Sequence, residues 1–479
     1  MNRKLIITLG IGAAFILVNC FAIIKEFLYI PVLSVVVVLA YLFIYRLDIM
    51  MYVMAFVTPL SITFSDQKIN IGLSIPAELI MIMLSLIFIA RLFYDIRLER
   101  KIVLHPISVV IYLYLFWTLI TSITSELPLV SFKFFASKIW FITSCYFCVI
   151  QFVKNDLKKM IVFLNCYAFA LGIVIIYATV KLALNGFAVR GMHWIMTPFY
   201  NDHTAYGAAI AFFIPLITAL ILIDGKTIWR KLYYFSLMAV MFTGLYFSYC
   251  RAAWLSVIFA FCVWIAIELR IKFSWLIVGF AILGSTLYYF SDDILYRMSR
   301  NSQDSSGEFF EHITSISNIS TDASNVERIN RWVAAFGMIE DRPVIGWGPG
   351  TYQFLYAGYQ KGKYKTIIST NFGTGGNAHS EYIGPCAEMG FPGAIIVIIL
   401  MITVIYVGLR AAIRTKEKIP KMLALFSVIA LITYYVHGIM NNFLDTDKLS
   451  LPFWAAIAVI VVVDLWGKKE SINNLKFKI

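Results

Sequence analysis

The chain has 479 residues, of which 61% are hydrophobic and only 14% are charged, whereas soluble domains carry roughly 25% charged residues. Its mean hydropathy is +0.81. This composition excludes an ordinary soluble domain and indicates a polytopic membrane protein. The net charge of +13 is expected of a protein whose basic residues lie beside an anionic inner leaflet, so it requires no nucleic-acid partner.

Apolar runs long enough to cross a hydrocarbon layer of about 30 Å recur along the whole sequence. They cover residues 5–24, 28–45, 49–64, 75–90, 106–124, 138–153, 160–184, 204–223, 232–250, 252–267, 273–290, 391–409, 422–440 and 451–466. The first run follows Arg3 and Lys4, as in a signal peptide, but it is long and no small-residue cleavage site follows it. The runs predict an all-α polytopic membrane protein of about 12–14 transmembrane helices.

The positions of Lys and Arg predict the orientation, because these residues accumulate in cytoplasmic loops. With both termini cytoplasmic, the inner segments hold 24 of the 40 basic residues, and the long polar stretch lies outside. We expect four regions: an N-terminal bundle (1–184), helices with Arg-bearing outer turns (185–290), a large outer loop with short helices (291–390), and C-terminal helices with a cytoplasmic tail (391–479).

Polar residues at the outer rim of a membrane protein are candidates for a site, because ionisable groups there are costly. Arg190 and His203 lie in one outer cluster, and Arg251 lies between two apolar runs with almost no polar linker around it. Either Arg could anchor a turn by extending its charge towards water. The alternative is a guanidinium that binds a phosphate or diphosphate head group. Two Arg residues facing one compartment favour the second interpretation.

The long loop contains a predicted amphipathic helix. Ser324 to Glu327 has the pattern of a capping box, and Ile329, Trp332, Val333, Phe336 and Ile339 recur at helical spacing. The helix is expected to end at Asp341-Arg342-Pro343, before a turn at residues 346–350. Arg328 and Arg331 are three residues apart on it, so they are either two solvated charges or two donors to one anion.

His379 is the first candidate for catalysis, although a lone His at a membrane surface is usually structural. It follows a Gly-rich segment, and Glu381 or Glu388 is placed to orient its ring. A neutral imidazole near pH 7 is suited to taking a proton from a sugar hydroxyl. The seven Cys residues lie mostly within apolar runs and predict no metal site.

Three motifs together resemble the O-antigen ligase and polymerase family of bacterial envelope assembly. They are Ser248-Tyr-Cys-Arg251-Ala-Ala, Arg331-Trp332 through Asp341-Arg-Pro-Val-Ile-Gly-Trp-Gly-Pro-Gly350, and Asn377-Ala-His379-Ser-Glu-Tyr through Glu388-Met-Gly-Phe-Pro-Gly393. A weaker correspondence lies at Tyr200-Asn-Asp-His203. Many relatives have His-Asn where this chain has His379-Ser380, a departure that leaves the His intact.

The resemblance implies a glycosyltransferase of the bacterial inner membrane that uses an undecaprenyl-diphosphate-linked glycan, with its site at the outer face and no metal, cofactor or nucleotide sugar. His379 would be the base, and Arg190 and Arg251, helped by Arg328 or Arg331, would stabilise the diphosphate. His203 and Glu388 complete the expected substrate-binding set. Attack opposite the leaving group predicts inversion, and no clear acid and base carboxylate pair indicates a glycosidase.

The acceptor is left open by these motifs. We expect a ligase that attaches the glycan to the lipid A core, because a second large outer loop would have favoured a polymerase. A surface polysaccharide polymerase and a protein O-oligosaccharyltransferase use the same donor chemistry. A transporter of the same lipid-linked glycan is the alternative from a different class, although no internal repeat is evident.

Overall fold

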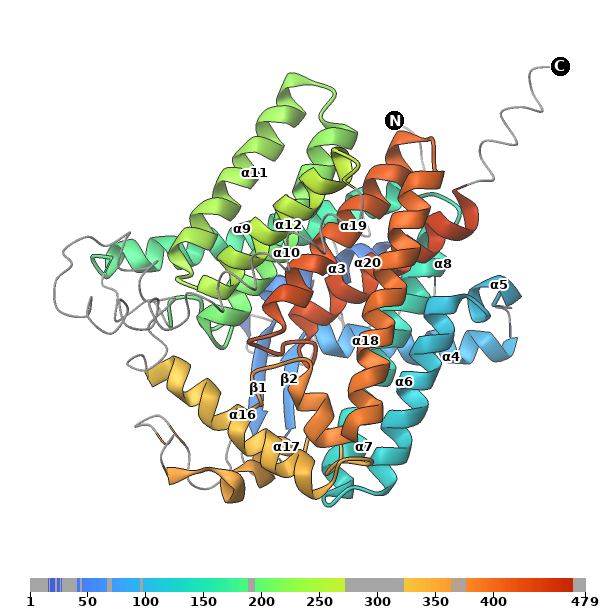
Figure 1. Cartoon of the computed structure of the whole chain (residues 1–479). Coiled ribbons are helices and arrows are strands. Elements are labelled where there is room, and N and C mark those ends of the chain that lie inside the picture. Colours follow the sequence, from blue (N-terminus) through green and yellow to red (C-terminus); the bar gives the residue numbers. More distant parts are fainter. Residues whose placement is uncertain are drawn as a thin grey trace. The chain divides into compact units, whose positions relative to one another are not determined.

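The computed structural model of the chain (Figure 1) describes residues 41–66 except 44, 71–94, 98–187, 194–271, 323–362, 365, 369 and 376–467, with isolated positions in 16–27. Its contacts divide the chain into two compact units, Met1–Met54 and Ala55–Ile479. The second unit contains every feature discussed below from the first hairpin onwards.

The described elements are almost all helical, with one antiparallel hairpin. In chain order they are α3 (Leu47–Val57), a 3-10 turn (Thr58–Leu60), β1 (Ile62–Asp66), β2 (Ile71–Ile75), α4 (Ala77–Tyr94), α5 (Arg100–Val103), α6 (Pro106–Ile123), α7 (Pro128–Ile142), a π-helix (Thr143–Cys148), α8 (Val149–Val153), α9 (Lys158–Leu184), α10 (His203–Asp224), α11 (Ile228–Phe247), α12 (Arg251–Glu268), α16 (Ala323–Asp341), α17 (Tyr352–Leu355), a 3-10 turn (Tyr356–Tyr359), α18 (Ile383–Arg414), α19 (Lys418–His437) and α20 (Asp447–Trp466).

Nine helices in the described part of the chain are long and apolar enough to cross a membrane. They are α4, α6, the continuous helix Pro128–Val153, α9, α10, α12, α18, α19 and α20. The prediction of an all-helical polytopic membrane protein is confirmed. The predicted spans 5–24, 28–45 and 273–290 lie wholly or largely outside the described residues, and the predicted span 232–250 corresponds to α11.

The predicted span at residues 49–64 is wrong. The helix α3 ends at Val57, and β1 begins at Ile62 and pairs with β2 in the register Ile62↔Ile75 to Asp66↔Ile71. The reason is Pro59, which lacks a backbone N–H and disfavours helix in the residue before it. The 11 residues of α3 rise only about 16 Å, too little to cross a bilayer alone.

The helix α18 is longer than the predicted span 391–409, because its first turns reach into the polar stretch. Its backbone breaks at Gly390, where φ is 70° and ψ is −179°. The Phe391 amide leaves the helical ladder and donates to the Pro343 carbonyl at 2.8 Å. The break therefore joins a short outer segment, Ile383 to Met389, to the long apolar helix that follows.

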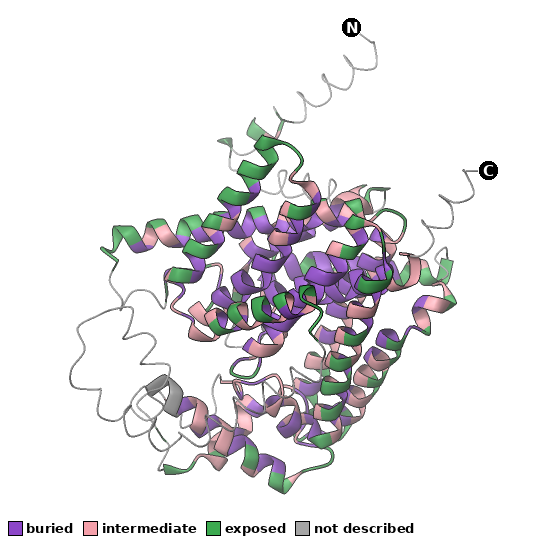
Figure 2. Ribbon diagram, turned by 45° about the horizontal axis from the view of Figure 1, so that its top comes forward, coloured by how far each residue is buried: buried purple, intermediate pink, exposed green. Residues whose placement is uncertain are grey.

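The core is formed by α10, α19 and α20, which pack against one another. Buried residues make up 83% of the apolar windows of α10 and α20 and 72% of that of α19, but only 28% of that of α12. Figure 2 shows buried positions gathered in the middle and exposed ones on the outer helices. The exposed residues of α4, α6, α12 and α18 are themselves largely apolar, as expected of surfaces that face lipid.

Polar contacts gather at two opposite sets of helix ends. On one side, called the site face below, the α6–α7 turn meets the turn at residues 346–350, and loop 438–446 meets the segment 376–382. On the other side Arg410 pairs with Asp464 at 2.5 Å, and Lys154 pairs with Glu99 at 3.5 Å. That the second face is the cytoplasmic one stays a prediction.

Candidate functional site

The helix α16 lies across the start of α18 and carries the site's two central Arg residues. The predicted amphipathic helix is confirmed, and it ends at Asp341 as expected. Ser324 already lies within α16, and the Glu327 carboxylate is engaged with Arg331, so the capping box is wrong. The buried face also differs from the predicted one, since Phe336 is 52% exposed while Ala334, Ala335 and Met338 are buried.

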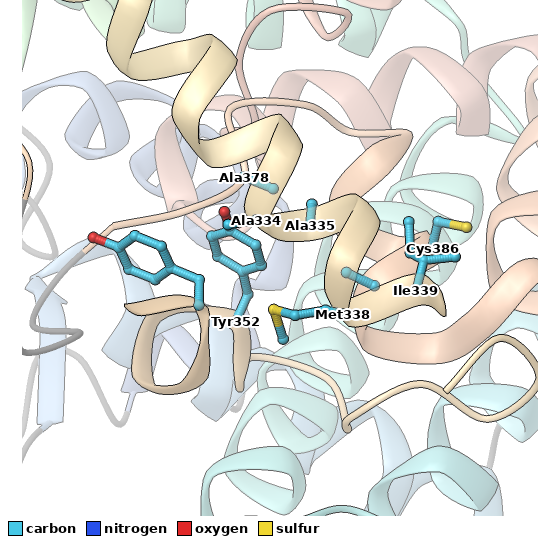
Figure 3. Close-up of a cluster of buried hydrophobic side chains, with 9 residues drawn as sticks. Ala334, Ala335, Met338, Ile339, Tyr352, Ala378 and Cys386 are labelled. Atoms are coloured by element: carbon cyan, nitrogen blue, oxygen red, sulfur yellow. The ribbon is translucent and has the colours of Figure 1, made fainter. Parts of the chain in front are cut away.

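Small side chains on α16 allow a close approach of the segment that precedes α18. Ala334, Ala335, Met338 and Ile339 form one buried cluster with Tyr352, Tyr356, Ala378, Cys386 and Ala387, as shown in Figure 3. Ala378 belongs to this cluster, so the residue immediately before His379 is fixed in the core. Apolar packing therefore positions the candidate base.

The turn at residues 346–350 is fastened to α18 by backbone bonds. The amides of Trp347 and Gly348 donate to the carbonyls of Ala387 and Glu388 at 3.2 and 2.8 Å. Gly346 has a φ of 63°, and a Cβ there would overlap the Glu388 carbonyl. Only glycine fits this approach.

Arg331 holds the segment 376–379 against α16. Its Nε donates to Glu327 Oε1 at 2.9 Å, and its Nη1 donates to the Asn377 carbonyl at 3.0 Å. Gly376 lies directly on the guanidinium, because a Cβ there would overlap Nη1. Both Arg331 and Glu327 are buried. The structure thus gives Arg331 an internal positioning contact, while its predicted role as a helper at the diphosphate stays a prediction.

His379 stands in a strained turn. Its φ is 47°, a left-handed value that non-glycine residues rarely adopt, and its amide donates to Asn377 Oδ1 at 3.1 Å. Such outliers are often found at functional sites. Burial first, and then the positive charges of Arg331 and Arg328, lower the pKa of His379 to about 3. The imidazole is therefore neutral at pH 7 and lies within the field of two guanidinium groups.

Neither Glu381 nor Glu388 orients the His379 ring, contrary to expectation. Glu381 Oε1 accepts bonds from the Phe443 and Leu444 amides at 2.9 and 3.1 Å and from the Tyr434 hydroxyl. Burial, followed by the charge of Asp445, raises the pKa of Glu381. Glu388 Oε1 accepts the Tyr352 amide at 3.1 Å. Both carboxylates therefore accept hydrogen bonds from nearby backbone amides, because those buried N–H groups lie within reach of the two side chains.

Arg328 links His379 to helix ends that are distant in sequence. Its charge acts on His379, on Cys250 beside Arg251, and on His437 at the end of α19. The thiol of Cys250 and the ring of His437 also lie within the field of Asp202, the residue that caps α10. The charge of Arg328 thus connects the predicted motif at 250–251 with His379, and Asp202 acts on two of the groups that Arg328 also affects.

The other predicted substrate-binding residues differ in what the structure shows of them. His203 is the first residue of α10, and Arg251 is the first residue of α12. Arg190 lies outside the described residues. Among the described residues no three His, Cys, Asp or Glu side chains group as metal ligands.

A cavity of about 440 Å³ borders the segment 376–378. Its walls come from α6, α7, α18, α19, α20 and loop 438–446, and Gly376, Asn377 and Ala378 line it beside His379. Aromatic residues line much of it: Tyr114, Phe134, Tyr382, Tyr435, Phe453 and Trp454. Glu381, Glu388 and the ion pair of Lys138 with Asp445, at 2.7 Å, complete the polar part.

Sequence reasoning missed the contribution of loop 438–446 and its flanking residues. His437, Asn442 and Asp445 all lie near the site, and Lys138 on α7 donates to Asp445 Oδ1. The signal that could have found them is the density of polar residues in this short connection between two apolar runs, Asn441-Asn442 and Asp445 to Lys448. The connection carries none of the three motifs, so nothing else in the sequence singles it out.

The fold and the site define a polytopic membrane protein with a polar centre at one end of its helices. Residues 235–398 match the family model described as O-antigen ligase, about a third of the chain. This segment is thus similar to the O-antigen ligase family, and the resemblance predicted from the motifs is confirmed over residues 235–398. No curated protein matches the chain.

The matched segment contains most of the candidate residues. Arg251, Arg328, Arg331, His379 and Glu388 lie within it, whereas Arg190 and His203 precede it. The weaker correspondence expected at residues 200–203 is therefore outside the matched segment.

Proposed function

We propose that this protein transfers a glycan from an undecaprenyl-diphosphate carrier to an acceptor hydroxyl at the outer face of the bacterial inner membrane, as an O-antigen ligase acting on the lipid A core does. The observation that carries the proposal is that His379, next to the cavity-lining Ala378, lies within the field of Arg331 and Arg328, and that the charge of Arg328 also acts on Cys250 at the start of α12. It combines a neutral base with cationic groups, which is the pairing that this reaction needs.

On the donor side, Arg328 and Arg251 stabilise the negative charge that grows on the departing diphosphate. Guanidinium groups are suited to this because they stay charged and present several donors in one plane. Arg190 is assigned to the same role from its predicted position on the outer face, with His203 nearby at the start of α10. Arg331 acts mainly by fixing the His379 segment, through its bond to the Asn377 carbonyl.

On the acceptor side, the hydroxyl oxygen attacks the anomeric carbon while the carbon–oxygen bond to the diphosphate breaks. The bonding electrons leave with the diphosphate, and the proton of the hydroxyl goes to the His379 ring. Attack from the side opposite the leaving group inverts the anomeric centre. No metal takes part in this scheme, because the Arg residues neutralise the leaving group.

The donor also adjusts the base. Without substrate, burial first and then the charges of Arg331 and Arg328 lower the pKa of His379 to about 3, which makes the ring a weak proton acceptor. A bound diphosphate offsets the two Arg charges, so the pKa of the ring rises, while burial still holds it below the ordinary value of about 6.5. His379 thus becomes a stronger base when the donor is in place, which limits deprotonation of an acceptor when no donor is bound.

Surface glycans of cells that lack the gene test the proposed acceptor. Loss of long glycan chains, with lipid-linked polymer accumulating, is the expected result, and wild-type protein restores the chains while His379→Ala does not. Single repeats on the surface would indicate a polymerase, and altered glycoprotein mobility would indicate transfer to protein. Unchanged surface glycans and glycoproteins would contradict all three assignments. If cells without the gene fail to export the lipid-linked glycan while membranes prepared from them still transfer it, the protein would be a transporter.

A further inference from the structure

The cavity beside His379 has polar atoms that the protein itself does not satisfy. Within the described residues, Tyr435 Oη and Asn442 Oδ1 are buried without a hydrogen-bond partner, and both residues line the cavity. Glu381, whose Oε1 accepts the bonds described above, also lines the cavity. Buried polar groups are nearly always paired, so unpaired atoms around one space indicate a ligand there.

The lining suits a sugar. Aromatic faces from Tyr435, Phe453 and Trp454 offer apolar surfaces for the C–H faces of a pyranose, and carboxylates and amides bind its hydroxyls. The volume of about 440 Å³ falls within the range of ligand sites, roughly 300–1,000 Å³. The same combination is poorly matched to a lipid chain, because a hydrocarbon would leave the carboxylates and amides unsatisfied.

The charge of the lining argues against the donor's head group. Three carboxylates, Glu381, Glu388 and Asp445, line the cavity against one ammonium group, that of Lys138, which is already paired with Asp445. A diphosphate placed there would find no free cationic partner among the lining residues, which include neither Arg328 nor Arg331. The lining is therefore neutral to acidic, whereas the charges of Arg328 and Arg331 act on His379.

We propose that this cavity binds the acceptor, through an uncharged terminal sugar whose hydroxyls are held by Tyr435, Asn442, Glu381 and Glu388, and that it presents one hydroxyl at the His379 segment. This inference rests on the proposed function and adds to it the class and the place of the acceptor. The cavity also selects against acidic sugars, because Glu381, Glu388 and Asp445 outnumber its one ammonium group, that of Lys138.

Photo-crosslinking in living cells identifies whatever molecule occupies the cavity. Benzoylphenylalanine replaces Tyr435 or Trp454 in the His379→Ala protein, which traps substrates without turnover, and mass spectrometry identifies the adducts. Tyr406, which is 64% exposed on α18, is the matched control for lipid contact. We expect glycan-bearing adducts without a polyprenyl chain at Tyr435 and Trp454, and phospholipid adducts at Tyr406. Polyprenyl adducts at Tyr435, or the same phospholipids at all three positions, would overturn the inference.

Kinetics then separate this inference from the proposed function. With undecaprenyl-diphosphate-linked glycan as donor and lipid A core as acceptor, Tyr435→Phe removes one hydroxyl and should raise the KM for the acceptor about 2- to 10-fold. The KM for the donor should stay unchanged, and Tyr406→Phe should change neither. A rise in the donor KM alone would refute the acceptor assignment, while the proposed function would stand. Absence of transfer by the wild-type protein would instead refute the proposed function, and the crosslinks still identify the cavity's occupant.

Discussion

Replacing Arg331 by Met should destabilise the protein and slow glycan transfer for two separable reasons. The change removes the guanidinium that pairs with Glu327 at 2.9 Å and bonds the Asn377 carbonyl at 3.0 Å. Removing one partner of a buried ion pair costs about 3–5 kcal/mol, because the other charge is left uncompensated. The segment that carries His379 also loses its fastening, and a misplacement of about 1 Å can cost on the order of 100-fold in rate.

The double variant Glu327→Gln with Arg331→Met separates the two effects. It removes the uncompensated charge, so much of the stability should return, but the transfer rate should stay low because Asn377 is still released. Thermal unfolding of the purified protein and transfer in vesicles measure the two quantities. Arg342→Met is the control, since Arg342 pairs with Glu126 at a partly exposed site, where a pair is worth about 0–1 kcal/mol. Recovery of both stability and rate in the double variant would refute the positioning role.

The glycine break, the donor site and the base give three further predictions. Gly390→Ala should lower the yield of folded protein, because its φ is 70° and a Cβ there would overlap the Val344 carbonyl. Gly358→Ala is the control, since a Cβ at Gly358 meets no atom within 4 Å. Equal yields of the two variants would contradict the close approach of Gly390 to Val344. Arg251→Ala should raise the KM for the donor roughly 10-fold or more by loss of a charge-assisted bond, whereas the control Lys361→Ala should leave it unchanged. A normal donor KM for Arg251→Ala would indicate that Arg251 only anchors its turn. Because burial and the charges of Arg331 and Arg328 lower the pKa of His379 to about 3, kcat/KM should stay level between pH 7 and pH 5, and Arg328→Ala should move its acid limb to higher pH; an unmoved limb would contradict the electrostatic effect of Arg328. A lowered His pKa also means that the unfolded chain binds more protons between about pH 6.5 and pH 3, so this residue's contribution makes stability fall on acidification through that window.

The sequence could predict the membrane architecture because apolar runs and helix length obey one simple constraint. It failed at residues 49–64, where Pro59 ended the helix and polar residues formed a hairpin instead. The presence and the end of α16 were predictable from periodicity, but its buried face was not, since Ala334 and Ala335 face the core for close approach while Phe336 is exposed.

For the site, charge counting predicted that distant Arg motifs share one face. The charge of Arg328 acts on both His379 and Cys250, while the roles of Arg190 and Arg251 stay predictions. The partners of Glu381 and Glu388 could not be predicted, because they are backbone amides at residues 443, 444 and 352, brought near only by the packing of α18, α19 and α20. The cavity could not be predicted from the sequence for the same reason. Its walls come from six helices and loops whose proximity no spacing in the sequence records.

In the proposed mechanism His379 takes the proton of the acceptor hydroxyl while Arg residues hold the diphosphate. The most direct measurement uses purified protein in vesicles with an undecaprenyl-diphosphate-linked glycan, and compares transfer and donor binding for wild type and His379→Ala. We predict that the variant binds the donor normally and loses transfer by about 100- to 10,000-fold, the usual contribution of a positioned general base. Transfer at the wild-type rate by His379→Ala would contradict this mechanism.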